Sequence, residues 1–476
     1  MENEVAVLVN ENEVKDHRKE YFEQIKNNGK YEINKELATA LLAIEFGNKN
    51  IIISGSAGTG KSTFIELFQE YTRKSYGLFA PTGVASLNIG GVTLHSFFGL
   101  SIGIADKFDF NRSDEKREII NKLDVFIIDE ISMVRSDVID AIDYQLKYFT
   151  GNFDQPFGGK KMVFIGDLFQ LPPIVQKGTL EEKIILEAYS TPWFFGADIG
   201  EFVFIIFEKI YRQNSKELIS TLNRIRVGTQ TDDDLKYLNK RTLFSSLPDK
   251  TIFLTTTRAK ADEKNFVNLN KIQDKSFYYS AKVNGEFPET IMPTKTLLEL
   301  KIGAQVMFVK NHKDGSWFNG TIGRIVGIEV FDGSDIILVE DEYGELKKVS
   351  IEKWENYKYV LEFDRPKKKI VGEFYQYPLI LAWAITIHKS QSKTYENIYI
   401  DLGRGMFAAG QAYVALSRCK TLEGIHLSRP LRKSDIIVDN DVRKFFLKNF
   451  YEEKEEVKKI ENWKQCSSTE SNRKRL

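Results

Sequence analysis

The sequence contains a glycine-rich stretch whose residue types and spacing are those of a phosphate-binding loop. It has the pattern G-x-x-x-x-G-K-S and directly follows the apolar run 51–53. Glycines allow backbone N–H groups to curl around a β-phosphate, while Lys61 can reach the β and γ oxygens and the Ser62 hydroxyl can ligate magnesium. The residues assigned to nucleotide binding here are Gly55, Ser56, Ala57, Gly58, Thr59, Gly60, Lys61, Ser62 and Thr63. The loop therefore predicts a site for ATP and Mg²⁺.

Two adjacent carboxylates end the apolar run 125–128, downstream of the phosphate loop. Asp129 can hold the magnesium ion directly or through water, and Glu130 can polarise the attacking water. A strand that ends in Asp-Glu is by itself as often structural as catalytic. Together with the phosphate loop, the pair predicts a magnesium-dependent nucleoside triphosphatase.

Three more polar side chains are candidates for the same reaction. Gln170 follows the apolar run 162–165, and its amide could contact the γ-phosphate and the attacking water together, because it both donates and accepts. Arg212 and Arg418 lie beyond the first predicted layer. If they reach across a cleft, each would supply positive charge to the γ-phosphate. An exposed loop glutamine and surface arginines in ion pairs are the alternatives.

Other residues fit a nucleic-acid path. Hydroxyls and backbone N–H groups hold phosphates, and aromatic rings stack on bases without reading sequence. The candidate contacts are Pro81, Thr82, Gly83, His95, Phe97, Phe98, Thr386, His388 and Lys389. Each is weak alone, since adjacent phenylalanines are more often core residues and a single histidine is more often an ordinary hydrogen-bonding residue.

The elements that must position these residues follow an α/β pattern. Short apolar runs alternate with helix-like stretches, as in parallel α/β layers. The runs are 51–54, 76–80, 125–128, 162–165, 202–207, 252–254, 396–400 and 424–427. We expect a first layer over about 34–200, and a second layer split into 201–295 and 377–445.

The stretch 296–376 differs from both layers. It has short strands with Asn-Gly and Asp-Gly turns, which predict a small antiparallel barrel inserted into the second layer. Residues 1–33 are expected to form a weakly determined N-terminal extension with one helix near 16–26. Residues 446–476 are expected to form a charged C-terminal tail.

Composition excludes several classes of protein. Lys+Arg and Asp+Glu are each 67, so any basic binding surface must be local. The 2 cysteines and 5 histidines offer neither a disulfide framework nor a zinc pattern, which fits a reducing compartment. No apolar run is long enough to span a membrane. We expect a soluble cytoplasmic protein of bacterial or phage origin that is monomeric when free.

The ordered motifs resemble those of the Pif-one-like DNA helicases of superfamily 1B, which are related to the RecD and Dda helicases. The matching blocks are Gly-Ser-Ala-Gly-Thr-Gly-Lys-Ser (55–62), Ala-Pro-Thr-Gly-Val-Ala (80–85), Ile-Asp-Glu-Ile-Ser-Met-Val (128–134), Gly-Asp-Leu-Phe-Gln-Leu-Pro-Pro (166–173), Tyr-Arg-Gln (211–213), Thr-Ile-His-Lys-Ser-Gln (386–391) and Tyr-Val-Ala-Leu-Ser-Arg (413–418). The resemblance covers about 34–430, and the segment that begins at Glu130 looks like a signature of this family.

The resemblance implies two RecA-like lobes with ATP between them, a small wedge insertion at about 99–122, and an SH3-like barrel at 296–376. It implies translocation from 5′ to 3′ on single-stranded DNA and unwinding of tailed or forked duplexes, in replication, repair, recombination or telomere-type maintenance, near the nucleoid. It adds G-quadruplexes and RNA–DNA hybrids as candidate substrates. The ATPase set carried over is Lys61, Ser62, Asp129, Glu130, Gln170, Arg212 and Arg418, and the DNA contacts carried over are Thr82, His95 and His388.

Two positions depart from the family pattern. Many members have a glutamine that reads adenine before the phosphate loop, whereas this chain has Leu37 at that position. Many members also follow His-Lys-Ser-Gln with Gly-Leu-Thr, and this chain has Ser392-Lys393-Thr394. The first departure puts base selectivity in doubt, and the second puts a DNA-contacting loop in doubt.

Two other functions stay open from the sequence. One is a nucleotide-gated protein that binds or remodels DNA without processive unwinding; Glu130 and the two arginines argue against it, because binding alone needs none of them. The other is a motor subunit of a recombination complex, which would require a partner because the chain has no nuclease motif.

Overall fold

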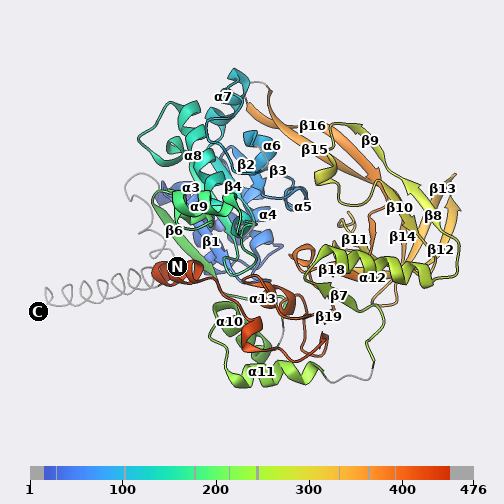
Figure 1. The fold of residues 1–476 in the computed structure, drawn as a ribbon. Helices are drawn as coiled ribbons and strands as arrows, with labels where there is room; N and C mark the ends of the chain where they lie inside the picture. The colour runs from blue at the N-terminus through green and yellow to red at the C-terminus, as the bar shows by residue number, and fades with distance from the viewer. Residues whose placement is uncertain are drawn as a thin grey trace, which may run out of the picture.

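The phosphate loop lies at the carboxyl edge of a six-stranded sheet in which all strands are parallel (Figure 1). The computed structural model describes residues 15–27, 29–100, 103–175, 178–213, 215–242, 246–331, 333–362, 365–391 and 393–450. Across the sheet the strands are β3 (Val92–Thr93), β2 (Tyr76–Ala80), β4 (Val125–Ile128), β5 (Lys161–Gly166), β1 (Asn50–Gly55) and β6 (Phe202–Phe207). The segments that follow β1, β4 and β5 therefore meet at one edge, where ligands bind in such sheets.

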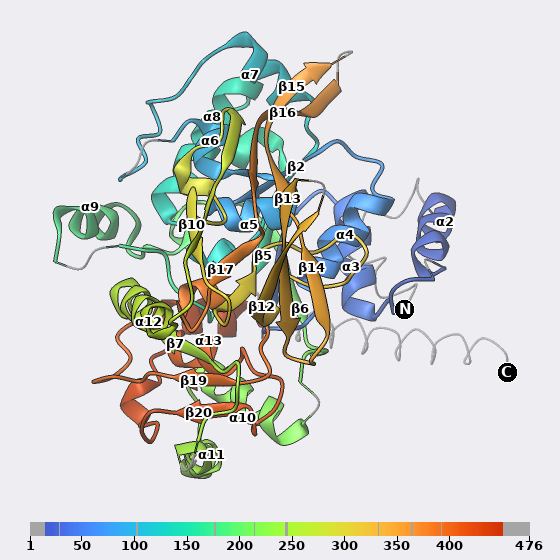
Figure 2. The same cartoon turned by 90° about the vertical axis from the view of Figure 1, so that its right-hand side faces the viewer.

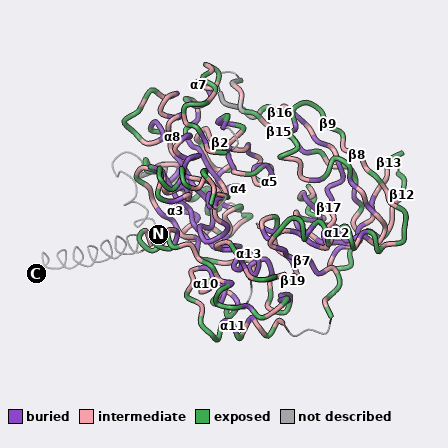
Figure 3. The backbone as a smooth tube through the Cα atoms, in the orientation of Figure 1, coloured by how far each residue is buried: buried purple, intermediate pink, exposed green. Residues whose placement is uncertain are grey.

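Both faces of this sheet are covered by helices, as continuous apolar strands require. Alternate residues of one strand enter different cores: Ile51 and Ile53 pack with one set of helices, and Ile52 packs with the other. Figure 3 shows the burial concentrated in these strands. The helices of this lobe are α2 (Lys15–Lys26), α3 (Lys35–Phe46), α4 (Lys61–Tyr71), α5 (Gly83–Asn88), α6 (Leu94–Phe98), α7 (Asp114–Lys122), α8 (Ser136–Thr150) and α9 (Leu180–Tyr189).

The last strand of this sheet corrects the expected boundary between the layers. Residues 202–207, which the sequence assigned to the second layer, form β6 and pair with β1 in parallel along its whole length. An apolar strand pattern shows that a strand is buried but does not show which sheet it joins. The first lobe therefore extends to residue 207.

A second, four-stranded parallel sheet forms the core of the other lobe. Its strands, in order, are β18 (Ala384–Thr386), β7 (Ile252–Thr255), β19 (Ile398–Ile400) and β20 (Ile425–Leu427). Its helices are α10 (Lys216–Val227), α11 (Asp232–Asn239), α12 (Arg258–Lys271) and α13 (Gln411–Leu416). The sheet is built from two segments far apart in sequence, as the split second layer predicted. The predicted mixed α/β class, with two lobes that each contain a parallel sheet, is thus confirmed.

The strand-rich insertion begins earlier and ends later than 296–376. Antiparallel pairing joins β14 (Leu346–Val349), β13 (Ser334–Asp341), β12 (Ile322–Phe331), β11 (Gln305–Phe308) and β17 (Leu379–Leu381) into one sheet. A second sheet contains β15 (Glu352–Glu362), β16 (Arg365–Gln376) and β9 (Lys282–Gly285), and β8 (Phe277–Ser280) pairs with β10 (Leu297–Leu300). The β15–β16 hairpin reaches from the insertion to α7 of the first lobe (Figures 1 and 2).

Both ends of the described chain pack more firmly than the sequence indicated. Helix α2 confirms the expected helix near 16–26, and its Tyr21 and Ile25 are fully buried against the first lobe. Residues 440–450 are helical, and Phe446 packs on Phe169 with ring centroids 5.1 Å apart. The expected tail boundary at 446 is therefore wrong, and the rest of that segment, 451–476, lies outside the described residues.

The region at about 99–122, expected to be a small wedge insertion, contains α7 and the loop before it, of which 101–102 lie outside the described residues. Ile119 and Ile120 of α7 belong to the core of the first lobe. Among the helices of the described ranges, none combines the length and the apolar character that a membrane crossing needs.

Candidate active site

The phosphate loop joins β1 to α4 in a conformation that depends on its glycines. Gly58 and Gly60 have φ values of 82° and 89°, a left-handed region that disfavours other residues. At Gly58 a Cβ atom would also lie 2.4 Å from Cβ of Arg212. The Tyr211 backbone N–H donates to the Gly58 carbonyl at 2.8 Å. The segment that follows β6 is thus packed directly on the loop.

Lys61 begins α4 and lies over the loop. Its Nζ donates to the carbonyl oxygens of Gly55 at 2.7 Å and Ser56 at 3.0 Å. Burial lowers the pKa of the Lys61 amine, and the carboxylates of Asp167, Glu130 and Asp129 oppose that shift. The amine therefore lies among acidic groups at the position from which it can reach a phosphate.

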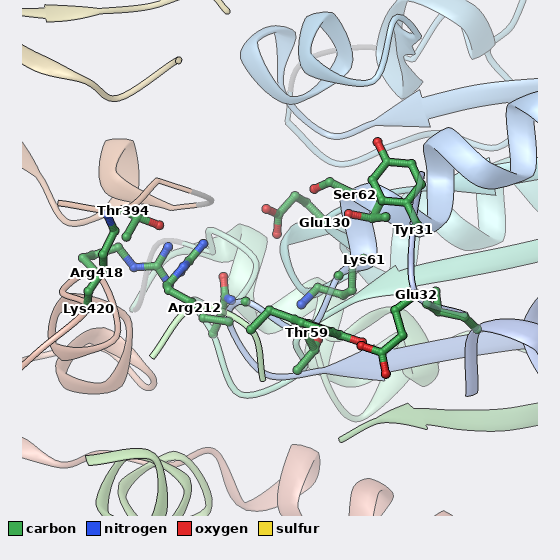
Figure 4. Close-up of a pocket in the computed structure, with 17 residues that line it drawn as sticks. Tyr31, Glu32, Thr59, Lys61, Ser62, Glu130, Arg212, Thr394, Arg418 and Lys420 are labelled. Carbon is green, nitrogen blue, oxygen red and sulfur yellow. The ribbon is translucent and has the colours of Figure 1, made fainter. Parts of the chain in front are cut away.

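A cavity of about 510 Å³ opens over the loop and collects most of the predicted ATPase residues (Figure 4). Its size is that of a small-molecule site. The lining residues are Tyr31, Glu32, Leu37, Ala57, Gly58, Thr59, Gly60, Lys61, Ser62, Thr63, Glu130, Gln170, Tyr211, Arg212, Thr394, Arg418 and Lys420. Residues from both lobes line it, which the motif order alone could not show.

The two carboxylates after β4 have different environments. Burial, followed by the charge of Glu130, raises the pKa of Asp129 to about 7. Glu130 has a φ of 51°, a left-handed conformation that costs a residue with a side chain about 1–3 kcal/mol and is common at functional sites. Asp129, Glu130 and Ser62 together line a second cavity of about 310 Å³ beside the loop. Their oxygen atoms are the donors that Mg²⁺ prefers, so the residues fit the ion that the phosphate loop implies.

Arg212 and Arg418 point toward one another at one side of the cavity, but they come from different parts of the chain (Figure 4). Arg212 lies in the segment that connects β6 to α10, so it does not reach across from the second sheet as expected. Arg418 follows α13 and is fully buried. Burial and the neighbouring Arg418 lower the pKa of Arg212 to about 9, which leaves it charged at neutral pH.

The hydrogen bonds of these two guanidinium groups, counted over the described residues, end on backbone carbonyls and one serine hydroxyl. Arg418 donates to the carbonyls of Val414, Ser390 and Lys393 and to the Ser417 hydroxyl. Arg212 donates to the Ser417 carbonyl at 3.5 Å. One buried and one half-buried cation, neither paired with a carboxylate within the described ranges, make this side of the cavity attractive to a polyanion.

Gln170 lines the cavity as predicted, and its neighbours include residues that the sequence did not single out. Gln170 Nε2 lies 3.4 Å from Asp167 Oδ2, and Gln391 Nε2 from the second lobe donates to Gln170 Oε1 at 3.3 Å. Asp167 also accepts from Arg226 and Tyr413. Asp167 and Tyr413 lie inside quoted motifs, but only their hydrogen bonds between the two lobes distinguish them from equally buried neighbours in those motifs.

Two predicted DNA contacts are wrong as base-stacking residues. Phe97 and Phe98 are 8% and 2% exposed and pack with Phe79 and Phe126 in the core of the first lobe. Ring centroids of Phe79 and Phe97 are 4.7 Å apart. Helix α6 turns these rings inward because the sheet face needs covering, so they are unable to stack on a base.

The remaining candidates of the first lobe lie after β2 and on α6. Thr82 is exposed, and its hydroxyl accepts from the Ala85 N–H at 3.3 Å to cap α5. Pro81 is half-buried, and Gly83 is buried where a Cβ atom would lie 2.6 Å from Cα of Ile291. Gly83 is therefore a packing position. His95 is half-buried, and burial and the charge of Arg135 lower its pKa.

The candidates of the second lobe lie together at the end of β18. The Thr386 hydroxyl accepts from the Lys389 N–H at 3.2 Å. His388 is half-buried, and burial lowers its pKa. Lys389 is exposed, and its pKa is lowered by burial of part of the side chain and by the charges of Arg258 and Lys295. This local group of positive charges exists although the chain has no net charge. Ser392, one of the two departures, lies outside the described residues.

Known proteins share both the sequence and the fold. The sequence model of the family described as PIF1-like helicase matches residues 32–233. The ATP-dependent DNA helicase Pif1 of Bdellovibrio bacteriovorus is 32% identical over 425 residues, which is 87% of this chain and 92% of that protein.

Two solved structures of Bacteroides Pif1 match most of both chains. The complex with ADP-AlF4 has a TM-score of 0.82 and 36% identity, over 88% of this chain and 97% of that chain. The complex with ADP-AlF3 and ssDNA has a TM-score of 0.64 and 35% identity, over 89% of this chain and 98% of that chain. The chain described here belongs to the PIF1-like family of ATP-dependent DNA helicases.

Proposed function

We propose that this helicase moves from 5′ to 3′ along single-stranded DNA and opens tailed or forked duplexes ahead of it. The observation that carries the proposal is the shared cavity, in which Arg418 of the second lobe faces the phosphate loop and Glu130 of the first lobe. Hydrolysis in such a cavity depends on the distance between the lobes. Changes in that distance can move a strand that contacts both lobes.

Each cavity residue has a proposed role in ATP hydrolysis. Loop N–H groups and Lys61 bind the β- and γ-phosphates. Ser62 and Asp129 hold Mg²⁺, which when bound neutralises charge on the phosphates. Glu130 orients and activates the attacking water, and Gln170 contacts that water and the γ-phosphate. Arg212 and Arg418 stabilise the charge that develops on the transferred phosphoryl group.

The proposed DNA path runs over the ends of β2 and β18, at the opposite lobes. Pro81, Thr82 and His95 are the candidates that remain on the first lobe. Thr386, His388 and Lys389 are the candidates on the second. Hydroxyls and a lysine suit backbone contacts, which bind without sequence preference. The relative with ADP-AlF3 was solved with ssDNA, which supports single-stranded DNA as the ligand of this chain.

The cellular setting is part of the proposal. We propose a protein that is monomeric when free and that acts in the cytoplasm at the nucleoid of a bacterium or on phage DNA, in replication, repair or recombination. Telomere-type maintenance, G-quadruplexes and RNA–DNA hybrids stay as candidate roles and substrates.

The deciding experiment compares ATP-dependent strand separation on duplexes that carry only a 5′ tail or only a 3′ tail. We expect unwinding of the 5′-tailed duplex alone, and none with Glu130→Gln, which keeps the cavity but loses the carboxylate. Unwinding of the 3′-tailed duplex would overturn the polarity. DNA-stimulated hydrolysis without unwinding of either duplex would favour a remodelling protein or a motor that needs a partner.

A further inference from the structure

A buried hydroxyl connects the second lobe to the phosphate loop. Tyr413 belongs to α13 and is 3% exposed. Its Oη accepts a hydrogen bond from the Ala57 N–H at 3.0 Å and donates one to Asp167 Oδ2 at 2.9 Å. Ala57 is part of the phosphate loop and lines the nucleotide cavity. One side chain of the second lobe thus contacts the loop and the carboxylate below it together.

Asp167 is held in place from both lobes. Its Oδ1 accepts from Arg226 Nε at 2.9 Å and from the Phe169 N–H at 3.2 Å. The Arg226 guanidinium lies over the rings of Phe169 and Phe446, 4.7 Å and 5.4 Å from their centroids. Because Asp167 is fully buried, it has few orientations available. It therefore presents Oδ2 to Tyr413 at a fixed place.

The contact depends on the distance between the lobes. Tyr413 and Arg226 lie on α13 and α10 of the second lobe, whereas Ala57 and Asp167 follow β1 and β5 of the first. Separation of the lobes would leave a buried N–H and a buried carboxylate oxygen without this partner, which is costly. The hydroxyl therefore favours one spacing of the lobes and one position of the loop.

We propose that Tyr413 is a positioning residue for ATP hydrolysis, whose hydroxyl holds the phosphate loop in its working position when the lobes are close. Tyr413 lies outside the set of residues that line the cavity, so it acts through Ala57 and Asp167. The inference rests on the proposed function, because it treats the spacing of the lobes as the variable that hydrolysis depends on.

The test is Tyr413→Phe, which removes one oxygen and keeps the ring. Tyr377→Phe is the matched control: Tyr377 is 2% exposed, but its hydroxyl donates to the Asp335 carbonyl at 2.5 Å in the strand-rich insertion, away from the nucleotide cavity. For Tyr413→Phe we expect kcat for ATP to fall about tenfold or more, with KM changed less than about threefold. We expect Tyr377→Phe to match the wild type.

Steady-state ATP hydrolysis is measured with and without poly(dT), and kcat is obtained by dividing the maximal rate by the concentration of sites that bind a fluorescent ADP. This division removes any loss that comes only from misfolded protein. A normal kcat for Tyr413→Phe, with or without a lower melting temperature, would overturn the inference. If the wild type hydrolyses ATP without stimulation by poly(dT), the proposed function fails, while the comparison of kcat values still decides the role of Tyr413.

A double-mutant cycle provides the second measurement. Asp167→Asn keeps the shape of the side chain but lacks the carboxylate that Tyr413 and Arg226 share. If the two residues act through one contact, kcat of the double variant should be no lower than kcat of the less active single variant. A fold loss of kcat in the double variant equal to the product of the two single-variant fold losses would contradict a shared contact.

Discussion

Arg418 is a fully buried cation whose hydrogen bonds, among the described residues, go to backbone carbonyls and a serine hydroxyl rather than to a carboxylate. Such a group is costly unless an anion is nearby for part of the reaction cycle. Its pKa is lowered by burial, and the charges of Glu130 and Asp167 act against that shift. At the scale of residues, the cavity is therefore prepared for the negative charge of a triphosphate.

Removal of this cation should affect turnover more than binding. We expect Arg418→Ala to lower kcat for ATP by about 10³-fold or more, in line with other arginine fingers, while the affinity for single-stranded DNA changes little. Coupled-assay kinetics and fluorescence anisotropy with a labelled oligonucleotide measure the two quantities. Arg404→Ala, which changes an exposed arginine of the same lobe, should leave both unchanged; a tenfold loss or less in Arg418→Ala would contradict the assignment.

Leu37 should weaken discrimination between nucleobases. It is 3% exposed and lines the cavity near Tyr31 and Tyr211, so this end offers apolar and ring surfaces. Contacts of that kind discriminate weakly compared with buried hydrogen bonds. We expect kcat/KM for ATP and GTP to differ by less than about tenfold, and Leu37→Gln to increase the preference for ATP. A wild-type kcat/KM for ATP more than about a hundredfold above that for GTP would contradict this prediction.

The turn between β13 and β14 docks the insertion on the second lobe beside the nucleotide cavity. The Tyr343 hydroxyl donates to Glu396 at 2.8 Å, and Lys420 Nζ lies 3.3 Å from the same hydroxyl. Lys420 also lines the cavity. At the scale of elements, the insertion is thus connected to the nucleotide site by a small group of charged and polar side chains.

The stability of this docking should depend on pH through Glu342. Burial, followed by the charge of Glu396, raises the pKa of Glu342 to about 7. The folded protein therefore binds this proton more tightly than the unfolded chain, and stability falls as pH rises from about 4.5 to 7. We expect Glu342→Gln to melt at a higher temperature than the wild type at pH 8, with the difference vanishing toward pH 5. A difference that stays constant over this range would exclude the titration of Glu342.

The whole molecule resembles one state of its relatives more than another. The TM-score is 0.82 against a Bacteroides Pif1 with ADP-AlF4 and 0.64 against a Bacteroides Pif1 with ADP-AlF3 and ssDNA, although the sequence identities of 36% and 35% are nearly equal. In this chain the β15–β16 hairpin contacts α7 of the first lobe.

We expect single-stranded DNA to rearrange the insertion relative to the two lobes. Small-angle X-ray scattering of Glu130→Gln with ATP and Mg²⁺, with and without oligo(dT), measures the change in the distance distribution while hydrolysis is blocked. Curves that superimpose within error would contradict the expected rearrangement. Lys61→Ala, which should weaken nucleotide binding, provides the control for effects that need bound ATP.

Local sequence patterns were sufficient to predict the chemistry of the site and the two-layer architecture. These patterns are local. A few adjacent residues, with the strand or helix that holds them, are enough to identify a phosphate loop, a pair of carboxylates or a buried strand. Residues 57–62 of the loop, Glu130 and Gln170 accordingly line the nucleotide cavity, Asp129 lines the cavity beside it, and the parallel strands match the predicted runs.

Features that depend on contacts between distant segments could be seen only in the folded chain. Strand 202–207 joins the first sheet, Arg212 lies in the connection after it, and Phe97 and Phe98 enter the core. The hydroxyl of Tyr413 meets Ala57 across 356 positions of sequence. An apolar or polar pattern predicts whether a residue is buried or exposed. Which residue it contacts depends on how the whole chain packs.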